Sequence, residues 1–441
     1  MSGKRNLLLI NSFKKLLYSD HLKITFRSSP TDFTRIRKLP FDRVVLFMIS
    51  MVKKSLQIEL CNFTKTLNLK NLNFITNSAY NQARMKIKPE LFKYFMTSLN
   101  DEFYTDNDER VKLWKGFNLL ACDGTFLNLP MVPELIKKYG TTTNQHATEV
   151  LIVRCSILYD LLNHMILNGV LAPNKTGERE MLISLLNILE TSKNKYLIIL
   201  DRGYPGFDIA YELKKRNIDF VIRLSSNFNK AVEEFINSNE YDTTIELKPG
   251  KNTNIIKKLY FKNSSITVRL VKVILDNGDV EILMTSLTDN VEYPVSVFKE
   301  LYFMRWGIET LYDKLKNKLK VEEFTGYSNI SILQDFYCTL FLSNIQSLLV
   351  SEANEELIKQ NINDKKYEYK VNTNLSIGFI KGRIVDLFLK ENNAEDILKE
   401  LEGLFKKTLI PIRPNRSLQR NMGKYRTRTK PIIVKNFKNA L

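Results

Sequence analysis

The chain has 441 residues, of which 44% are hydrophobic and 11% aromatic, so it can bury a large core and we expect two or three domains. Its three histidines argue against a His-based triad or metal cage, and its four scattered cysteines indicate neither a disulfide framework nor a zinc site. The apolar runs are short and the first ten residues lack the pattern of a cleavable signal, so we expect a cytoplasmic protein with no membrane partner.

The net charge of +18 is concentrated at the two ends of the chain. Residues 1–100 carry 18 Lys and Arg against 5 Asp and Glu, and residues 403–441 carry 11 Lys and Arg with no acid. Residues 101–402 therefore have a net charge of −6. An excess of one sign at both ends favours binding to a polyanion. We expect nucleic acid, because no amphipathic membrane anchor accompanies the charge.

The first hundred residues are expected to form short helices. Residues 41–60 are apolar at helical spacing, and residues 77–88 have the pattern of a polar, basic helix capped by Asn77 or Ser78. Small helical domains of this kind can dock on DNA, although a plain helical bundle would show the same pattern.

From about residue 110 the pattern changes to strands and helices. Runs of β-forming residues bounded by Gly, Pro, Asn or Asp predict strands at 117–129, 149–159, 164–172, 196–200 and 219–224. Helices are predicted at 178–189 and 206–216, between the later strands. Three strands followed by alternating helix and strand predict a mixed sheet with helices packed on it, an order compatible with a ribonuclease-H-like fold.

Residues 226–295 are expected to be a β-rich insertion in this domain. Strands are predicted at 243–247, 255–261, 266–275 and 280–287. The last two flank Asp276-Asn277-Gly278-Asp279, a strong hairpin signal. Beyond the insertion we expect helices at 298–320 and 331–353 and a basic, extended tail at 403–441.

Two aspartates follow or lie within predicted strands. Asp201 ends the apolar run 196–200, where a carboxylate would project into a crevice at the carboxyl end of a sheet, although it could instead cap the helix beginning near Pro205. Asp123 lies inside an apolar strand, where a charge is costly unless it is paired or metal-bound. Burial alone explains the neighbouring Cys122.

The most specific pattern lies on the predicted helix 301–316. At about 100° per residue, Arg305, Glu309 and Lys316 all lie within about 60° of Tyr302 on one face. A face turned to the core should be apolar, whereas an exposed face could carry the same charges as simple surface pairs. Asp313 shares this face and is the reserve carboxylate.

Three carboxylates, two at strands and one on a later helix, suit Mg²⁺, which prefers oxygen ligands. Two such ions about 4 Å apart can activate water and stabilise the leaving oxygen of a phosphodiester, a chemistry that needs no histidine. Arg305 and Lys316 would neutralise phosphate charge. Tyr302 and Trp306 offer a hydrogen bond or a stacking surface, and Arg202 is a further expected DNA contact.

These motifs resemble those of the DDE transposases of bacterial insertion sequences, in the branch called insertion-sequence four. The resemblance rests on Asp-Gly-Thr at Asp123, Asp-Arg-Gly at Asp201 and the spacing Tyr302-x2-Arg305-x3-Glu309-x6-Lys316. That spacing is the family's Tyr-Arg-Glu-Lys motif without change. The resemblance covers roughly residues 30–350, and the tail after residue 403 lies outside it.

The resemblance implies a ribonuclease-H-like core in which Asp123, Asp201 and Glu309 bind Mg²⁺, with Mn²⁺ as an alternative. Relatives nick the transposon end, form and reopen a hairpin, and join the ends to target DNA. They act as dimers that bridge two transposon ends, so the implied partners are the double-stranded terminal inverted repeats, the target DNA and a second copy of the chain. Such a protein would associate with the nucleoid in the cytoplasm. In relatives the residues corresponding to Tyr302, Arg305 and Lys316 hold terminal phosphates, and an aromatic residue stacks on a flipped base; Trp306 is the candidate here.

Together these patterns predict an α/β protein with five segments. They are a helical DNA-binding domain at 1–105, the first part of the catalytic core at 106–225, the β-rich insertion at 226–295, the Glu-bearing and following helices at 296–355, and a helical C-terminal region with a basic tail at 356–441. Two alternatives remain open. One is a structure-specific nuclease on the same fold, and the other is a transposase-derived DNA-binding protein that has lost its chemistry.

Overall fold

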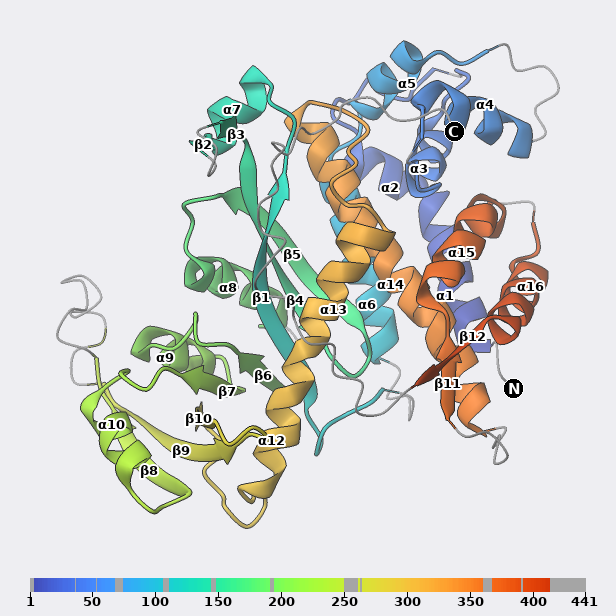
Figure 1. Ribbon diagram of the computed structural model, residues 1–441. Coiled ribbons are helices and arrows are strands. Elements are labelled where there is room, and N and C mark those ends of the chain that lie inside the picture. Colours follow the sequence, from blue (N-terminus) through green and yellow to red (C-terminus); the bar gives the residue numbers. More distant parts are fainter. Residues whose placement is uncertain are drawn as a thin grey trace. The chain divides into compact units, whose positions relative to one another are not determined.

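The computed structural model describes residues 4–35, 37–52, 54–67, 74–105, 111–143, 148–190, 194–249, 261, 264–359, 367–389 and 392–412. The chain forms two compact units, which are described separately (Figure 1). The sheet unit comprises Asp108–Phe126 and Arg154–Tyr312. The helical unit comprises Met1–Asn107, Leu127–Val153 and Asp313–Leu441.

The sheet unit is built on an eight-stranded mixed sheet (Figure 1). Its strands, in chain order, are β1 (Asn118–Asn128), β4 (Ile152–Asp160), β5 (Met165–Pro173), β6 (Tyr196–Leu200), β7 (Ile218–Leu224), β8 (Asp242–Leu247), β9 (Ile266–Ile274) and β10 (Val280–Thr285). They lie in the order β5-β4-β1-β6-β7-β10-β9-β8. Strands β1, β6 and β7 run parallel, whereas β7, β10, β9 and β8 are antiparallel neighbours. The predicted mixed sheet is therefore confirmed.

Helices cover the centre of this sheet. All five residues of β6 are buried, as expected for an apolar strand covered on both faces. The helices α8 (Glu178–Leu186), continued by a 3₁₀ turn at Asn187–Leu189, and α9 (Phe207–Lys215) pack against each other. Helix α9 links the parallel strands β6 and β7, the crossover that parallel neighbours require. Both helices confirm the sequence-based expectation.

The strands expected between residues 226 and 295 extend the same sheet, after the short helix α10 (Lys230–Asn237). The predicted hairpin is confirmed, since β9 and β10 pair antiparallel around a turn in which Gly278 has a φ of 84°. That backbone conformation favours glycine because a Cβ would be strained there. Of the strand predicted at 255–261, only Phe261 lies within the described residues.

The helical unit contains most of the helices and two short hairpins. Its helices are α1 (Lys4–Leu17), α2 (Asp20–Phe26), α3 (Phe41–Ile49), α4 (Leu56–Thr66), α5 (Asn77–Arg84), α6 (Glu90–Thr105), α7 (Pro133–Tyr139), α14 (Asn329–Lys359), α15 (Thr373–Phe388) and α16 (Ala394–Lys407). The hairpins pair β2 (Thr142–Thr143) with β3 (Glu149–Val150) and β11 (Glu368–Val371) with β12 (Leu409–Ile412). In its core, the ring of Phe13 lies 4.6 to 5.0 Å from those of Phe95, Phe341 and Phe388. No helix in the described ranges is long and apolar enough to cross a membrane.

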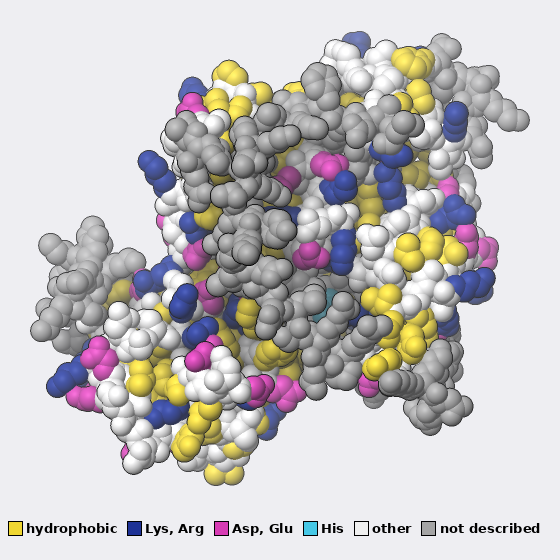
Figure 2. Space-filling view, viewed as in Figure 1, with side chains coloured by type: hydrophobic (Ala, Val, Ile, Leu, Met, Phe, Trp, Pro, Cys, Tyr) yellow, Lys and Arg dark blue, Asp and Glu magenta, His cyan; other side chains and the backbone are white. Residues whose placement is uncertain are grey.

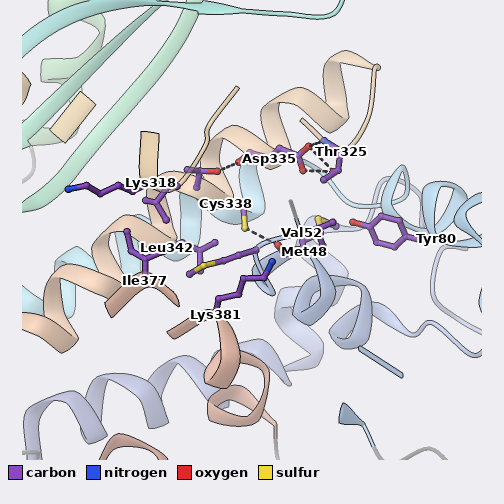
Figure 3. Close-up of a pocket in the computed structure, with 13 residues that line it drawn as sticks. Met48, Val52, Tyr80, Lys318, Thr325, Asp335, Cys338, Leu342, Ile377 and Lys381 are labelled. Atoms are coloured by element: carbon purple, nitrogen blue, oxygen red, sulfur yellow. Dashed lines mark hydrogen bonds between the residues drawn. The ribbon is translucent and has the colours of Figure 1, made fainter. Parts of the chain in front are cut away.

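A buried charge cluster joins α5 to α14. Arg84 is 1% exposed, and its Nη2 lies 2.8 Å from Oδ1 of Asp335, while its Nε donates to Oε1 of Gln334 at 2.9 Å. A cavity of about 70 Å³ lies beside the cluster (Figure 3). Figure 3 shows Asp335, Cys338 and Lys381 around it. Arg84 is thus an interior residue of the helical unit. Of the basic residues in the predicted helix 77–88, it is one that a ligand cannot reach.

Three details of the helical unit differ from expectation. The apolar segment 41–60 forms two helices because the chain turns at Met51, whose φ is 58°. Thr76, and neither Asn77 nor Ser78, caps α5, since its side chain accepts the N–H of Ala79. The tail expected to be extended from residue 403 is helical to Lys407, because α16 buries Leu401 and Phe405, and then pairs as β12. The rest of the tail lies outside the described residues.

Candidate active site

Asp123 lies on β1 with its carboxylate half-buried. Its Oδ1 accepts the N–H of Gly124 at 2.7 Å, and its backbone oxygen accepts the hydroxyl of Tyr312 at 2.6 Å. The pKa of Asp123 is raised to about 6, first by burial and then by the nearby carboxylates of Asp201 and Glu178, although the Gly124 hydrogen bond and Arg305 act to lower it. Burial and two neighbouring carboxylates thus disfavour the charged form of Asp123, and a bound cation would favour it.

Asp201 follows the last residue of β6, the parallel neighbour of β1. The pairing register aligns Ala121 with Ile199, so two more residues along each strand bring the chain to Asp123 and Asp201. Oδ1 of Asp201 accepts the N–H of Gly203 at 2.8 Å. The N-cap of α9 is Gly206, which makes no side-chain cap, so the alternative role of Asp201 as a helix cap is wrong.

The helix expected over 298–320 is interrupted. It consists of α12 (Ser296–Phe303), a 3₁₀ turn at Met304–Trp306, α13 (Gly307–Asp313) and a π-helical turn at Lys314–Lys318. The uniform rotation of about 100° per residue assumed for one regular helix is therefore wrong at both turns, because 3₁₀ and π geometry wind the chain more tightly and more loosely than an α-helix.

Tyr302, Arg305 and Glu309 nevertheless come together. Arg305 Nη2 lies 3.2 Å from Oε1 of Glu309, and its Cζ is 5.7 Å from the centre of the Tyr302 ring. Arg305 and Tyr302 are only 8% and 7% exposed. Burial raises the pKa of Tyr302, and Asp201 is among the charges that raise it further. Arg305 lowers the pKa of Asp123, so the structure brings this group to the two aspartates.

Two polar atoms of this group are buried without a hydrogen-bond partner in the described part of the chain. They are the hydroxyl of Tyr302 and Nε of Arg305. A buried donor left without a partner costs about 1 to 3 kcal/mol. Such donors are ready to bind an acceptor that arrives with a ligand, and phosphate oxygens are acceptors.

The remaining predicted residues are placed differently. Trp306 is 42% exposed, and Cζ of Arg305 lies 5.2 Å from its ring centre. Arg202 is exposed beside Asp201. Lys316 lies on the π-helical turn and belongs to the helical unit, so the structure does not group it with the others. Asp313, the reserve carboxylate, is exposed and accepts a hydrogen bond from Asn317 at 2.7 Å, also in that unit.

Glu178 was missed by sequence reasoning. It is the first residue of α8 and forms an ion pair with Arg154. Its carboxylate oxygens lie 2.9 Å and 3.1 Å from the points where a Cβ would stand on Gly124 and Gly203. The only signal for it in the sequence is that each aspartate motif contains a glycine, which leaves room for another side chain.

The carboxylates are chemically suitable ligands for a cation, but at least one side chain must move before all three can bind the same ion. Among the described residues no three His, Cys, Asp or Glu side chains are already grouped as metal ligands. Glu309 is held by Arg305, which also lies near Asp123. Rotation of one of these two side chains would therefore accompany binding of a cation by all three acids.

Comparison with known proteins supports this reading of the motifs. The sequence profile described as "Transposase DDE domain" matches residues 114–345. The transposase InsG for insertion sequence element IS4 of Escherichia coli (strain K12) is 26% identical over 298 residues, covering 66% of this chain and 65% of InsG. InsZ of the same strain is 25% identical over 193 residues, covering 41% of this chain and 60% of InsZ. The matched regions thus span less than two thirds of either relative.

A solved structure, the piggyBac transposase synaptic complex with hairpin DNA, aligns with 92% of this chain and 87% of that chain. The sequence identity is 12% and the TM-score 0.43, a likeness too weak to support an argument. The family match covers more than half of the chain and includes Asp123, Asp201 and Glu309. The predicted family is confirmed: the chain belongs to the transposase DDE domain family, with relatives that include an insertion-sequence-four transposase.

Proposed function

We propose that the chain is a cut-and-paste DNA transposase, which cleaves transposon ends and joins them to target DNA. The observation that carries the proposal is the grouping of Asp123 and Asp201, at neighbouring parallel strands, with the Arg305–Glu309 pair. The family generally uses divalent metal ions. Mg²⁺, with Mn²⁺ as the alternative, is the proposed cofactor.

The proposed catalytic core is ribonuclease-H-like. Its support is the strand order β5-β4-β1-β6-β7, in which a β-hairpin adjoins three parallel strands with crossover helices. In this proposal residues 106–225 and 296–355 form the core, 226–295 the insertion, 1–105 the DNA-binding domain and 356–441 the C-terminal region.

Asp123, Asp201 and Glu309 are the proposed metal ligands. Carboxylate oxygens are the donors that Mg²⁺ prefers, and Asp123 is a partly buried carboxylate with the carboxylates of Asp201 and Glu178 nearby, whose charge a cation would balance. When bound, two such ions would activate water or a 3′-OH and stabilise the leaving oxygen. The protein's part is to hold the carboxylates at the ends of β1 and β6, where the Gly124 and Gly203 N–H groups orient them.

Arg305 and Tyr302 are proposed to bind a phosphate of the DNA end. Both present a buried donor that has no partner in the described residues, and Arg305 adds charge. Trp306 is proposed to stack on a base, since its ring is partly exposed. Arg202 and Lys316 are proposed as further backbone contacts.

The proposed DNA-binding surface also includes a cavity of about 700 Å³ in the helical unit. Four basic residues line it: Arg35, Arg37, Lys38 and Lys86. Figure 2 shows Lys and Arg side chains distributed over much of the face in view, with Asp and Glu among them. A basic cavity on the N-terminal helices supports the expectation that they contact DNA, and nucleoid association in the cytoplasm would follow.

The test is Mg²⁺-dependent cleavage of a duplex that carries the inverted repeats flanking the gene. We expect D123A, D201A and E309A each to abolish cleavage while leaving DNA binding, whereas the control E300A, at an exposed glutamate of α12, keeps both. Cleavage that survives all three changes would refute the assignment. Cleavage without joined products would identify the nuclease alternative. DNA binding without cleavage by the unaltered protein would identify the other alternative, a transposase-derived DNA-binding protein that has lost its chemistry.

A homodimer is proposed for the complex with DNA. If each chain binds one transposon end, two chains must associate to bring the two ends together. Light scattering of the complex with a single-end duplex gives its mass. Two chains with two duplexes are expected, and one chain with one duplex would contradict the proposal.

A further inference from the structure

Glu178 shares the space between the two aspartate loops. A Cβ at Gly124 would stand 2.9 Å from Oε1 of Glu178, and a Cβ at Gly203 would stand 3.1 Å from its Oε2. The same point at Gly203 is 3.1 Å from Oδ1 of Asp201. The oxygens of Glu178 and Asp201 are therefore no farther apart than the sum of these two distances, a span that one cation with a bound water can bridge.

The structure assigns Glu178 as a fourth acidic residue of the metal site: we propose that its carboxylate binds the cation held by Asp123 and Asp201, directly or through one bound water. This inference rests on the proposed function. It differs from the three-acid site because Glu178 comes from α8, an element that supplies none of the other ligands.

Independent features of the site point to a ligand at the same place. Tyr302 and Arg305 are more than nine-tenths buried, and each has a buried donor atom without a partner in the described residues. The charge of Arg305 acts on Asp123, and that of Asp201 acts on Tyr302, so the two donors belong to the surroundings of the aspartates. Donors for phosphate oxygens beside carboxylates that can bind a cation match the two charged components of a metal-bound DNA end.

Arg154 is the counter-ion of Glu178 in this structure. Arg154 pairs with Oε1 of Glu178, and its Cζ lies 4.8 Å from the ring centre of Phe126. Its Nε is buried without a hydrogen-bond partner in the part of the chain described. A cation that binds Glu178 must compete with this guanidinium. Arg154 is thus a positioning residue that holds the carboxylate over the two glycines and weakens cation binding.

The experiment is titration of the full chain with Mn²⁺ alone, with free Mn²⁺ followed by electron paramagnetic resonance. We expect E178Q to weaken Mn²⁺ binding about tenfold or more, the loss typical of residues that support a metal site. The matched control is E180Q, an exposed glutamate of the same helical turn, which should bind as the unaltered protein does. Circular dichroism checks that both variants are folded.

Two further variants separate a metal role from a structural ion pair. R154Q should tighten Mn²⁺ binding, and this gain should disappear in R154Q/E178Q, because it acts through Glu178. G124A, whose new Cβ displaces the Glu178 carboxylate without removing a charge, should weaken binding. If E178Q binds Mn²⁺ as tightly as E180Q, the role of Glu178 is refuted.

D201N distinguishes this inference from the proposed function. If D201N weakens Mn²⁺ binding and E178Q does not, only the assignment of Glu178 fails. If D201N binds Mn²⁺ as tightly as the unaltered protein does, the proposed metal site fails and the inference fails with it.

Discussion

Replacing Asp123 by Asn removes a half-buried carboxylate charge while keeping an oxygen that can accept the Gly124 N–H. The folded state raises the pKa of Asp123 from 3.8 to about 6. Between these values the folded protein keeps a proton that the unfolded chain has released, so stability falls as the pH rises through this window. Above pH 6 the loss is complete and amounts to about 3 kcal/mol, since each pH unit corresponds to about 1.4 kcal/mol.

D123N should therefore be more stable than the unaltered protein by up to about 3 kcal/mol at pH 8 without metal, by about half as much at pH 5, and hardly at all near pH 3.5. Urea denaturation in the presence of a chelator measures these free energies of unfolding. E300Q, which replaces an exposed glutamate of α12, is the control and should show no such gain. Added Mg²⁺ should stabilise the unaltered protein more than D123N. An equal stability of D123N and the unaltered protein at pH 8 would refute the reasoning.

Three other predictions concern separate regions. Tyr302→Phe removes a buried hydroxyl that has no partner in the described residues. The free energy of unfolding should therefore stay equal or rise by about 1 kcal/mol, while cleavage of the transposon end falls at least tenfold. A loss of stability would show that the hydroxyl has an internal partner. Arg84→Met leaves the partly buried carboxylate of Asp335 without its counter-ion, although Thr325 still donates to it, and should lower the free energy of unfolding by about 3 kcal/mol. Lys381→Met, at a more exposed pair, should cost at most about 1 kcal/mol in the same denaturation assay. Removal of residues 413–441 takes away nine Lys and Arg while preserving β12, and should flatten the dependence of DNA affinity on salt; an unchanged slope in fluorescence anisotropy would assign the tail another role.

The sheet could be predicted because its strands are buried apolar runs with turn residues at both ends. Strand β6 agrees residue for residue with the predicted 196–200, and the hairpin of β9 and β10 follows from Asp276-Asn277-Gly278-Asp279. Local chemistry determines both features, so no knowledge of distant contacts is needed.

Features that depend on tertiary contacts could not be predicted in this way. The helix is broken at Met304–Trp306 and again at the π-helical turn Lys314–Lys318. The spacing of apolar residues in the sequence predicts neither break. Lys316 has the expected spacing in the sequence, yet it lies in the other compact unit. Glu178 joins the aspartates only because α8 begins beside the glycines of β1 and the β6 loop, which is a three-dimensional coincidence of segments distant in the sequence.

The way in which residues 226–295 extend the central sheet limits how this protein can be re-engineered. Strand β10 pairs with β7 over four residues, and β8 forms the outer edge, where its half-exposed strand carries Asp242 and Glu246. Excising the segment would leave β7 with an open, apolar edge, a template for pairing between chains. A trimmed version of the protein that lacks β10 should therefore aggregate during folding, whereas one that keeps β8, β9 and β10 should stay monodisperse.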